Sequence, residues 1–385
     1  MIRKIYLCLF IGLFCFLLIA YGYVNRDNLE SRILEVRKDI TFATAKDKIT
    51  AAESKYKGSI IGKNEIADVF GGSLRLLGIN HYENFHRENG ISFSVSLRKS
   101  DDQLKQDAKK VKDGILALVD KAKGAPVVLL HIISPILKSD DVFWYQSEIL
   151  PELLNVDYFD NKVSVLNIND ALTGNERVAY KFKSDFHLTT AGEFLTAKLL
   201  ANKLNELGIN VDTKVGSTNI FDLANYDIIE KPFLGNATRS LGHYWVGVDN
   251  FEMYVPKFDT AYEMADHDGN VIREGTYADV LMNGAEFKAD TDEYTYWITN
   301  YMQYPKAHYE ITNILRGRSR ILFIGDSMTM RTITFLSLGV NHIAVCDTRQ
   351  NNGTEILNEL LKQQWDAIVF APGISANMVN GLSGK

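Results

Sequence analysis

The stretch that decides the fold is residues 321–327, ILFIGDS. Four apolar residues followed by Gly-Asp-Ser predict a buried strand that ends in a sharp turn, and residues 328–338 continue with a helical pattern. Ser327 would then lie at the carboxyl edge of a sheet, near a helix N-terminus whose free N–H groups favour a developing negative charge. That is a suitable place for a nucleophilic serine. Because Gly, Asp and Ser are also common in turns, an ordinary turn after a strand is the alternative.

A second motif is DFH at residues 185–187, on the loop that enters a helix predicted over residues 193–207. Asp185 and His187 are two residues apart, so both can face one pocket. The carboxylate could then accept a hydrogen bond from one ring nitrogen while the other nitrogen takes the proton of Ser327. A surface loop with two polar residues is the alternative. Two such motifs in one chain, each at the end of an element, favour catalysis.

The rest of the chain alternates between strand and helix patterns, which is typical of a mainly parallel sheet with helices on both faces. The predicted strands cover residues 127–133, 163–168, 321–324, 342–346 and 366–370, and the predicted helices cover residues 104–122, 193–207, 328–338 and 354–364. Thr190 and Glu193 have the spacing of a capping box. In such sheets ligands bind beyond the carboxyl ends of the strands, where Ser327, Asp347 and Arg349 fall.

These motifs resemble the serine and Asp-x-His blocks of the SGNH (GDSL) hydrolase superfamily. Here the serine block comes last, an order that resembles the AlgX/AlgJ alginate O-acetyltransferase family and the related DHHW proteins. Their hallmark is Thr-Asp-x-His-Trp-Thr, and residues 184–189 read SDFHLT, with Leu188 for Trp and Ser184 for Thr. Residues 231–236 resemble the family's Phe-x-Gly segment and residues 347–349 its Asp-x-Arg segment. The reversed order leaves the chemistry intact, because a triad is defined by geometry.

The resemblance implies an SGNH-like fold from about residue 58 to 372 and a triad of Ser327, His187 and Asp185. It also implies O-acetylation of a polysaccharide acceptor, with acetyl supplied by a membrane-bound O-acyltransferase. The Ser327 N–H is expected to bind the oxyanion, with Arg349 as a second candidate, and no cofactor is needed. A carbohydrate acetylesterase would use the same triad. A non-catalytic, membrane-anchored glycan-binding or assembly protein is the third possibility.

The middle segment, residues 211–309, differs from the rest because it holds 17 of the chain's 42 aromatic residues in about a quarter of its length. We interpret it as an insertion with some strands that could cover the active site. Trp245 and Trp297 are the first candidates for stacking on sugar rings, since aromatic side chains offer apolar faces with polar rims. The alternative is that these aromatics form the core of the segment itself.

The N-terminal region contains an uncharged apolar run at residues 5–24, preceded by Arg3 and Lys4. Twenty apolar residues can span a bilayer as a helix, although a cleaved signal peptide is the alternative. We therefore expect a membrane anchor at residues 1–25, a helical stalk at residues 26–57 and an extracytoplasmic catalytic domain at residues 58–385, in the periplasm or outside the cell.

The composition excludes some classes of function. The net charge is −6 and no phosphate-binding loop or dinucleotide fingerprint is present, so a nucleic-acid or nucleotide partner is not expected. Cys346 is the only cysteine outside the apolar run, so no disulfide is expected within the domain. His81 with His86, or residues 266–268, could ligate a metal, but neither set has the spacing of a known site. No metal is therefore expected.

Overall fold

A computed structural model describes residues 63–82, 85–88, 90–94, 96–97, 100–132, 143–144, 159, 161–282, 297–300 and 307–371. The chain divides into two compact units, Met1–Ile66 and Ala67–Lys385. The expected anchor and stalk lie outside the described residues. Within the described ranges, none of the helices has the length and apolar character needed to cross a bilayer.

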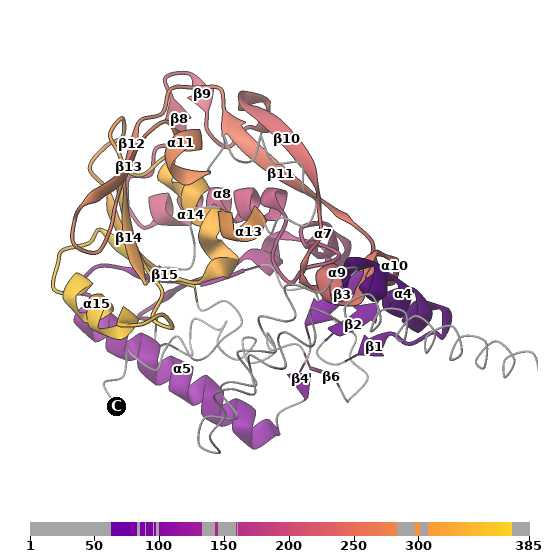
Figure 1. Ribbon diagram of the computed structural model, residues 1–385. Helices are drawn as coiled ribbons and strands as arrows, with labels where there is room; N and C mark the ends of the chain where they lie inside the picture. Colours follow the sequence, from indigo (N-terminus) through magenta and orange to yellow (C-terminus); the bar gives the residue numbers. More distant parts are fainter. Residues whose placement is uncertain are drawn as a thin grey trace, which may run out of the picture. The chain divides into compact units, whose positions relative to one another are not determined.

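The second unit is built on a central sheet of eight strands (Figure 1). In spatial order these are β13 (Val271–Gly275), β12 (Tyr262–Ala265), β14 (His308–Asn313), β16 (His342–Cys346), β15 (Arg320–Gly325), β17 (Ala367–Ala371), β5 (Val127–His131) and β7 (Ser164–Asn167). The five strands from β16 to β7 run parallel to one another. Strands β14, β12 and β13 add an antiparallel extension at one edge. The sheet is therefore mostly parallel, as predicted.

The five predicted strands are the five strands of the parallel block. The bounds of β16 are as predicted, and the others differ by one or two residues at an end. Four of these strands, β5, β15, β16 and β17, are mostly apolar and buried, which is the pattern of a strand covered on both faces, whereas the edge strand β7 (SVLN) is half-buried.

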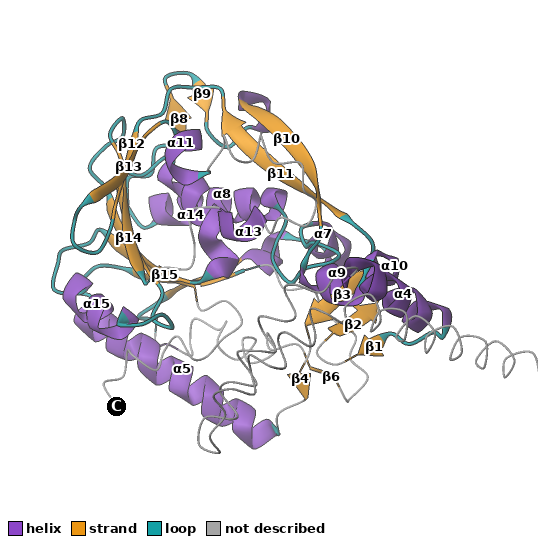
Figure 2. Cartoon of the chain, viewed as in Figure 1, coloured by secondary structure: helices purple, strands orange, loops and turns teal. Residues whose placement is uncertain are grey.

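Helices cover both faces of the sheet because successive side chains of each strand point to opposite sides (Figure 2). Leu322 and Ile324 belong to a core that includes α5 (Asp101–Lys121) and α15 (Gly353–Leu360). Ile321 and Phe323 belong to a larger core that includes α8 (Thr190–Glu206) and α14 (Met330–Ser337). Helix α8 follows the Asp-x-His loop and α14 follows the serine turn, so the helices that come after the two motifs pack on the same face of the sheet.

Smaller elements surround this framework. The helices are α4 (Lys63–Leu76), α7 (Gly174–Ala179), α9 (Asn236–Leu241), α10 (His243–Val246), α11 (Tyr277–Leu281) and α13 (Trp297–Asn300), with 3₁₀ turns η3 (Ile168–Ala171), η4 (Leu223–Asn225) and η6 (Ser327–Thr329). The strands are β1 (His81–Tyr82), β2 (Phe85–Glu88), β3 (Ile91–Ser94), β4 (Ser96–Leu97), β6 (Phe143–Trp144), β8 (Lys214–Val215), β9 (Thr218–Asn219), β10 (Tyr226–Phe233) and β11 (Asp249–Pro256). Strands β1 to β3 form a small antiparallel sheet, and β10 and β11 form a long hairpin.

The middle segment, residues 211–309, is joined to the central sheet. Strands β12 and β13 lie within it, and β14 begins in it and runs on to Asn313. Several of its described aromatic side chains are buried: Tyr262, Tyr277 and Tyr309 are among the largest fully buried residues. Burial in the protein's own core therefore accounts for much of the aromatic content of the segment.

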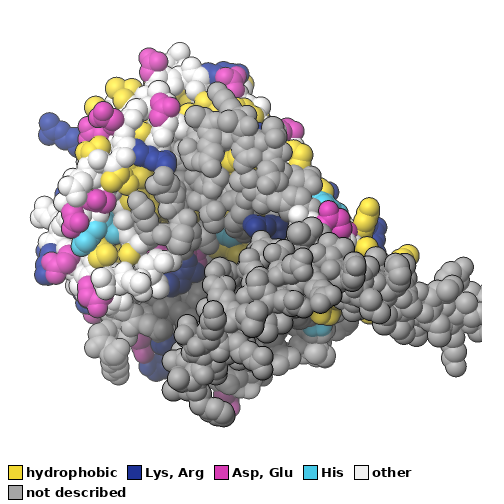
Figure 3. Space-filling view, in the orientation of Figure 1, with side chains coloured by type: hydrophobic (Ala, Val, Ile, Leu, Met, Phe, Trp, Pro, Cys, Tyr) yellow, Lys and Arg dark blue, Asp and Glu magenta, His cyan; other side chains and the backbone are white. Residues whose placement is uncertain are grey.

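The described surface carries both signs of charge. On the face shown in Figure 3, acidic side chains are interspersed with lysine and arginine, and the basic side chains form no continuous stripe.

Candidate active site

The serine turn begins where β15 ends. Asp326 caps η6, and its carboxylate accepts a hydrogen bond of 2.9 Å from the Met328 N–H. Ser327 thus starts a 3₁₀ turn that leads into α14, whereas the sequence predicted one helix over residues 328–338. Gly325 is required by space, because a Cβ there would lie 2.7 Å from both the Thr329 hydroxyl and the Phe323 ring. The turn is therefore tight, and the Ser327 side chain remains partly exposed.

Arg349 holds this turn in place. Its guanidinium donates to both carboxylate oxygens of Asp347, at 2.9 and 2.8 Å, and lies 3.1 Å from the Asp326 carboxylate. Burial raises the pKa of Asp326, and Arg349 opposes that rise. We expected Arg349 near the acyl oxygen. The structure shows that its guanidinium pairs with Asp347 and with Asp326, the carboxylate that caps η6, and the expected contact with the acyl oxygen stays a prediction.

The Asp-x-His motif lies on a loop that folds back on itself. The Phe182 N–H donates to the His187 carbonyl at 3.3 Å, and the Thr189 N–H donates to the Tyr180 carbonyl at 2.9 Å. These bonds join the two arms of the loop, and residues 183–187 form its tip. Asp185 and His187 are both almost fully buried there.

The structure brings the two motifs into contact across 140 residues of sequence. His187 Nε2 lies 3.1 Å from Ser327 Oγ, and His187 Nδ1 lies 2.6 Å from Asp185 Oδ1. Burial raises the pKa of Asp185, but the charge of His187 and the hydrogen bonds to the carboxylate outweigh burial and hold the pKa at about 2. Asp185 is thus an anion at neutral pH, aligned with a histidine that contacts the serine hydroxyl.

Two further groups fix Asp185. The Asn236 N–H, in the first turn of α9, donates to Asp185 Oδ2 at 2.8 Å, and the His187 N–H donates to Oδ1 at 3.0 Å. Gly235 allows this approach, because a Cβ there would lie 2.5 Å from the Ser184 carbonyl oxygen. The segment at residues 231–236, noted in the sequence only as a resemblance, therefore supplies a donor to the carboxylate.

Ser184 and Leu188, the two departures from the family hallmark, are both accommodated. The Ser184 hydroxyl donates to the Asp249 carboxylate at 2.5 Å and accepts from the Gly235 N–H at 2.9 Å. Serine supplies this hydroxyl as threonine would. Leu188 is 1% exposed and belongs to the larger core.

Asp249, at the start of β11, is a residue that the sequence did not single out. Besides the Ser184 hydroxyl, its carboxylate accepts from the N–H groups of Lys183 and Ser184, at 2.9 and 2.7 Å. It therefore holds the tip of the Asp-x-His loop. No local signal marks it, since its partners lie 65 and 66 residues earlier.

The start of α8 differs from the prediction. The N-cap is Thr189, whose hydroxyl accepts from the Gly192 N–H at 3.2 Å. The Thr190 hydroxyl donates instead to the Glu252 carbonyl, and Glu193 is fully buried. The predicted capping box of Thr190 and Glu193 was therefore wrong by one residue. The Glu193 carboxylate accepts instead from the Thr332 N–H of α14.

Trp245 and Trp297 are not at the surface. Trp245 is 0% exposed and packs with Leu74 and Leu241, and Trp297 is 1% exposed in the larger core. Neither presents a ring to an external ligand, so the alternative of a core position describes both. The structure brings together the serine, histidine and aspartate, and it places the two tryptophans elsewhere.

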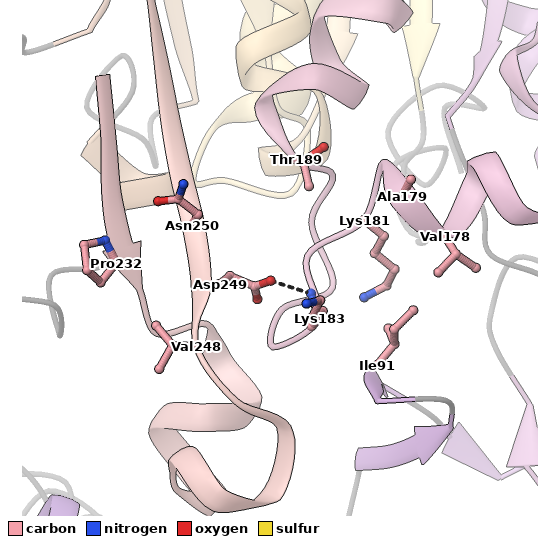
Figure 4. A pocket seen from close by; sticks show the side chains of 10 residues that line it. All are labelled: Ile91, Val178, Ala179, Lys181, Lys183, Thr189, Pro232, Val248, Asp249 and Asn250. Carbon is pink, nitrogen blue, oxygen red and sulfur yellow. Dashed lines mark hydrogen bonds between the residues drawn. The ribbon is translucent and has the colours of Figure 1, made fainter. Parts of the chain in front are cut away.

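A pocket of about 580 Å³ lies beside the Asp-x-His loop (Figure 4). It is lined by Ile91, Val178, Ala179, Lys181, Lys183, Thr189, Pro232, Val248, Asp249 and Asn250. The walls therefore come from the loop, α7, β3 and the β10–β11 hairpin of the middle segment. Lys181 is buried, and its ammonium donates to the Asp185 and Phe182 carbonyls. Burial lowers the pKa of Lys181 to about 8, against the opposing charges of Asp185 and Asp249.

The candidate metal ligands do not assemble. Asp266 caps a turn by accepting from the N–H groups of Asp268 and Asn270, at 3.0 and 2.9 Å. Among the residues that the structure describes, no group of three or more histidine, cysteine or acidic side chains is arranged to hold a metal ion.

Comparison with known proteins locates this fold. Bacillus cereus PatB1, in a structure with a sulfonyl adduct, is 17% identical with a TM-score of 0.57 over 77% of this chain and 97% of that chain. A DHHW family protein from Eubacterium siraeum DSM 15702 is 14% identical with a TM-score of 0.53 over 79% of this chain and 97% of that chain. The O-acetyltransferase domain of Pseudomonas putida AlgJ is a looser match. It is 11% identical, with a TM-score of 0.45, and the alignment covers 77% of this chain and 92% of that chain. No protein-family model and no curated protein matches the sequence.

These likenesses establish the fold. The resemblance to DHHW proteins, predicted from the motifs, is confirmed as a resemblance of structure. PatB1 and the DHHW protein match almost along their whole lengths, so the likeness of fold is not confined to the two motifs. At these identities the fold does not determine the activity.

Proposed function

We propose that this protein is an extracytoplasmic polysaccharide O-acetyltransferase that works through an acetyl-serine intermediate. The observation that carries the proposal is the hydrogen-bonded array of Ser327, His187 and Asp185, with a partly exposed serine and an ionised, buried aspartate. Such an array activates a hydroxyl for acyl transfer.

In the first half-reaction, Ser327 Oγ attacks the carbonyl carbon of an acetyl donor while His187 Nε2 accepts the hydroxyl proton. Asp185 accepts the Nδ1 hydrogen bond, holds the ring in the required tautomer and stabilises the imidazolium. As the tetrahedral intermediate collapses, the bond to the donor's leaving group breaks and His187 returns the proton to that group. Acetyl-Ser327 remains.

In the second half-reaction, a sugar hydroxyl gives its proton to His187 and its oxygen attacks the acetyl carbon. The bond to Ser327 Oγ breaks, His187 reprotonates the serine, and the sugar leaves as its acetyl ester. The Ser327 N–H is the proposed oxyanion donor, and loss of one such donor typically costs about 3–4 kcal/mol of transition-state stabilisation.

Transfer to a sugar, rather than to water, is supported by two features. The sequence motifs resemble those of the AlgX/AlgJ family, and a pocket lies beside the histidine loop. Its apolar residues Ile91, Val178, Pro232 and Val248 can contact the C–H faces of a sugar, and Asn250 and Lys183 can contact its hydroxyls. We propose this pocket, in place of the two tryptophans, as part of the acceptor site.

The proposed setting is the outer side of a membrane. The apolar run at residues 5–24 would anchor the chain, and the catalytic unit would receive acetyl from a membrane-bound O-acyltransferase. Cell fractionation and protease accessibility of the full-length protein test this arrangement. Recovery of the intact chain in the soluble cytoplasmic fraction would contradict it.

The decisive experiment treats the full-length protein with a sulfonyl fluoride and with a small acetyl ester. We expect mass spectrometry to place one sulfonyl group on Ser327, and we expect Ser327→Ala to lose both the label and the turnover. Adding oligosaccharide acceptors should yield acetylated oligosaccharide. Free acetate as the only product across many acceptors would replace the transferase with an acetylesterase, and turnover that survives Ser327→Ala would remove the serine mechanism.

A further inference from the structure

Behind the candidate active site, a fully buried polar cluster joins the two helices that follow the catalytic motifs. Glu193 lies on α8, six residues after His187, and Arg331 and Thr332 lie on α14, just after the serine turn. All three side chains are at most 2% exposed. The cluster therefore lies where the two halves of the proposed triad meet.

The contacts of this cluster cross between the helices. The Thr332 N–H donates to Glu193 Oε2 at 3.0 Å, and the Thr332 hydroxyl donates to the same oxygen. Arg331 lies 3.6 Å from Glu193 Oε1. Arg331 also donates to the Leu188 carbonyl, on the residue directly after His187. One guanidinium from α14, the helix that follows Ser327, thus contacts both α8 and the residue directly after His187.

The surroundings hold Arg331 in one orientation. Its guanidinium lies 5.6 Å from the centre of the Phe182 ring and 5.3 Å from that of the Phe251 ring. Phe182 belongs to the Asp-x-His loop and Phe251 to the hairpin strand that carries Asp249. Nearby, Phe194 of α8 and Phe335 of α14 pack edge to face at 5.1 Å. The aromatic contacts fix the plane of the guanidinium relative to the loop.

A buried ion pair is a poor way to stabilise a fold, because desolvation opposes the attraction between the charges. Burial raises the pKa of the Glu193 carboxyl to about 7 against the opposing pull of Arg331 and Thr332, so desolvation outweighs them here. A well-packed apolar pair would serve stability as well. An apolar pair would not, however, fix the register of α8 relative to α14, because apolar contacts are not directional.

We infer that Arg331 and Glu193 are positioning residues that hold the first turns of α14 and α8 in register and so set the contact between Ser327 and His187. This inference rests on the proposed function for its kinetic readout. The pair touches neither the serine nor the histidine, and it acts through the Leu188 carbonyl and the Thr332 N–H. A shift of about 1 Å between reacting groups can lower a rate about 100-fold.

The test compares Arg331→Met, Arg331→Lys and Glu193→Gln with Tyr277→Phe in the full-length protein. Tyr277 donates to Thr334 at 3.0 Å, a buried bond to the same helix α14 that lies away from the serine turn. We expect Arg331→Met to lower both kcat for the acetyl ester and the rate of Ser327 sulfonylation about 10–100-fold, with little change in KM. Tyr277→Phe should lower the melting temperature and leave both rates unchanged. Arg331→Lys, which keeps the charge, should recover part of the loss.

Each outcome decides the inference. If folded Arg331→Met has the same kcat and sulfonylation rate as Tyr277→Phe, the pair is merely structural and the inference fails. If Arg331→Met does not fold at the assay temperature, Glu193→Gln decides, since it keeps an oxygen for Thr332, and unchanged rates in it also overturn the inference. If the wild type labels at Ser327 without turning over any acetyl ester, the proposed function fails, and the labelling rates still decide the role of the pair.

Discussion

The serine turn and the histidine loop are two halves of one site, and they are held in different ways. The serine turn is fixed mainly by nearby sequence: Gly325 allows the bend, Asp326 caps it, and Arg349 pairs with Asp326 from the turn that follows the next strand, β16. The histidine loop is fixed from a distance, by the Asn236 N–H and the Asp249 carboxylate. A local motif therefore makes the nucleophile's turn, whereas the base depends on the correct folding of the middle segment.

The largest expected effect comes from removing the negative charge of Asp185 in the histidine loop. Asp185→Asn should leave the protein folded and lower kcat by about 10⁴-fold, because an amide favours the wrong histidine tautomer and does not stabilise the imidazolium. Steady-state turnover of the acetyl ester measures this effect. A loss below about tenfold would show that Asp185 is only a structural acceptor.

Breaking the distant support of the loop should have the next largest effect. Asp249→Asn weakens the contacts to two N–H groups and a hydroxyl at the loop tip, so we expect kcat to fall about 10–100-fold as the loop loses its alignment. The matched control is Asp227→Asn on the same hairpin, where an exposed carboxylate lies 3.6 Å from Lys257. Equal kcat in the two variants would mean that the hairpin does not hold the base.

The support of the serine turn should matter less. Asp326→Ala removes a cap, a change that typically destabilises by about 1 kcal/mol, and it also frees Arg349 from one carboxylate. Asp222→Ala is the control, because Asp222 caps η4 through the same kind of bond, at 3.1 Å to the Ala224 N–H. We expect thermal unfolding to show similar losses in both variants, with kcat reduced about tenfold only in Asp326→Ala. A larger kinetic loss than in Asp249→Asn would reverse the comparison.

The smallest expected effect is a dependence of stability on pH that arises from Glu193, which links α8 to α14. The pKa of Glu193 is raised to about 7 in the folded protein from 4.5, so the folded state binds this proton more tightly than the unfolded chain. Its contribution to stability is greatest below pH 4.5 and is lost as the pH rises toward 7. Between pH 5 and 7 the melting temperature of the wild type should fall relative to that of Glu193→Gln by about 2 °C. Parallel curves would show that Glu193 does not titrate in this window.

The central sheet and the two motifs were predictable because their signals are local. Most of the parallel strands are short apolar runs, and β15 with its Gly-Asp-Ser end can be recognised in seven residues. The start of α8 was misplaced by one residue, because Thr189 and Thr190 are adjacent and either could act as the cap. That error also hid Glu193, whose spacing suits a cap and whose actual partners lie 139 residues away.

The remaining features depend on contacts between distant segments. Asp249 is an ordinary aspartate until the β10–β11 hairpin places it against the loop. Strand β14 reads HYEITN, and its polar residues obscured its place beside β16 in the central sheet. The burial of Trp245 and Trp297 could not be predicted either, because an aromatic ring suits a sugar-binding surface and a core equally well.

The order of the strands bears on how the molecule is made. Strand β17 is the last strand described in the chain, yet it lies in the middle of the sheet, between β15 and β5. Of the strands in the central sheet, β5 and β7 emerge first during synthesis, and β5 keeps an open edge until β17 has left the ribosome. An open, apolar strand edge pairs readily with other chains, and sheets that depend on distant pairings form slowly. The nascent protein is thus most prone to aggregation before β17 emerges, and deletion of β17 would remove the strand that joins the two parts of the sheet.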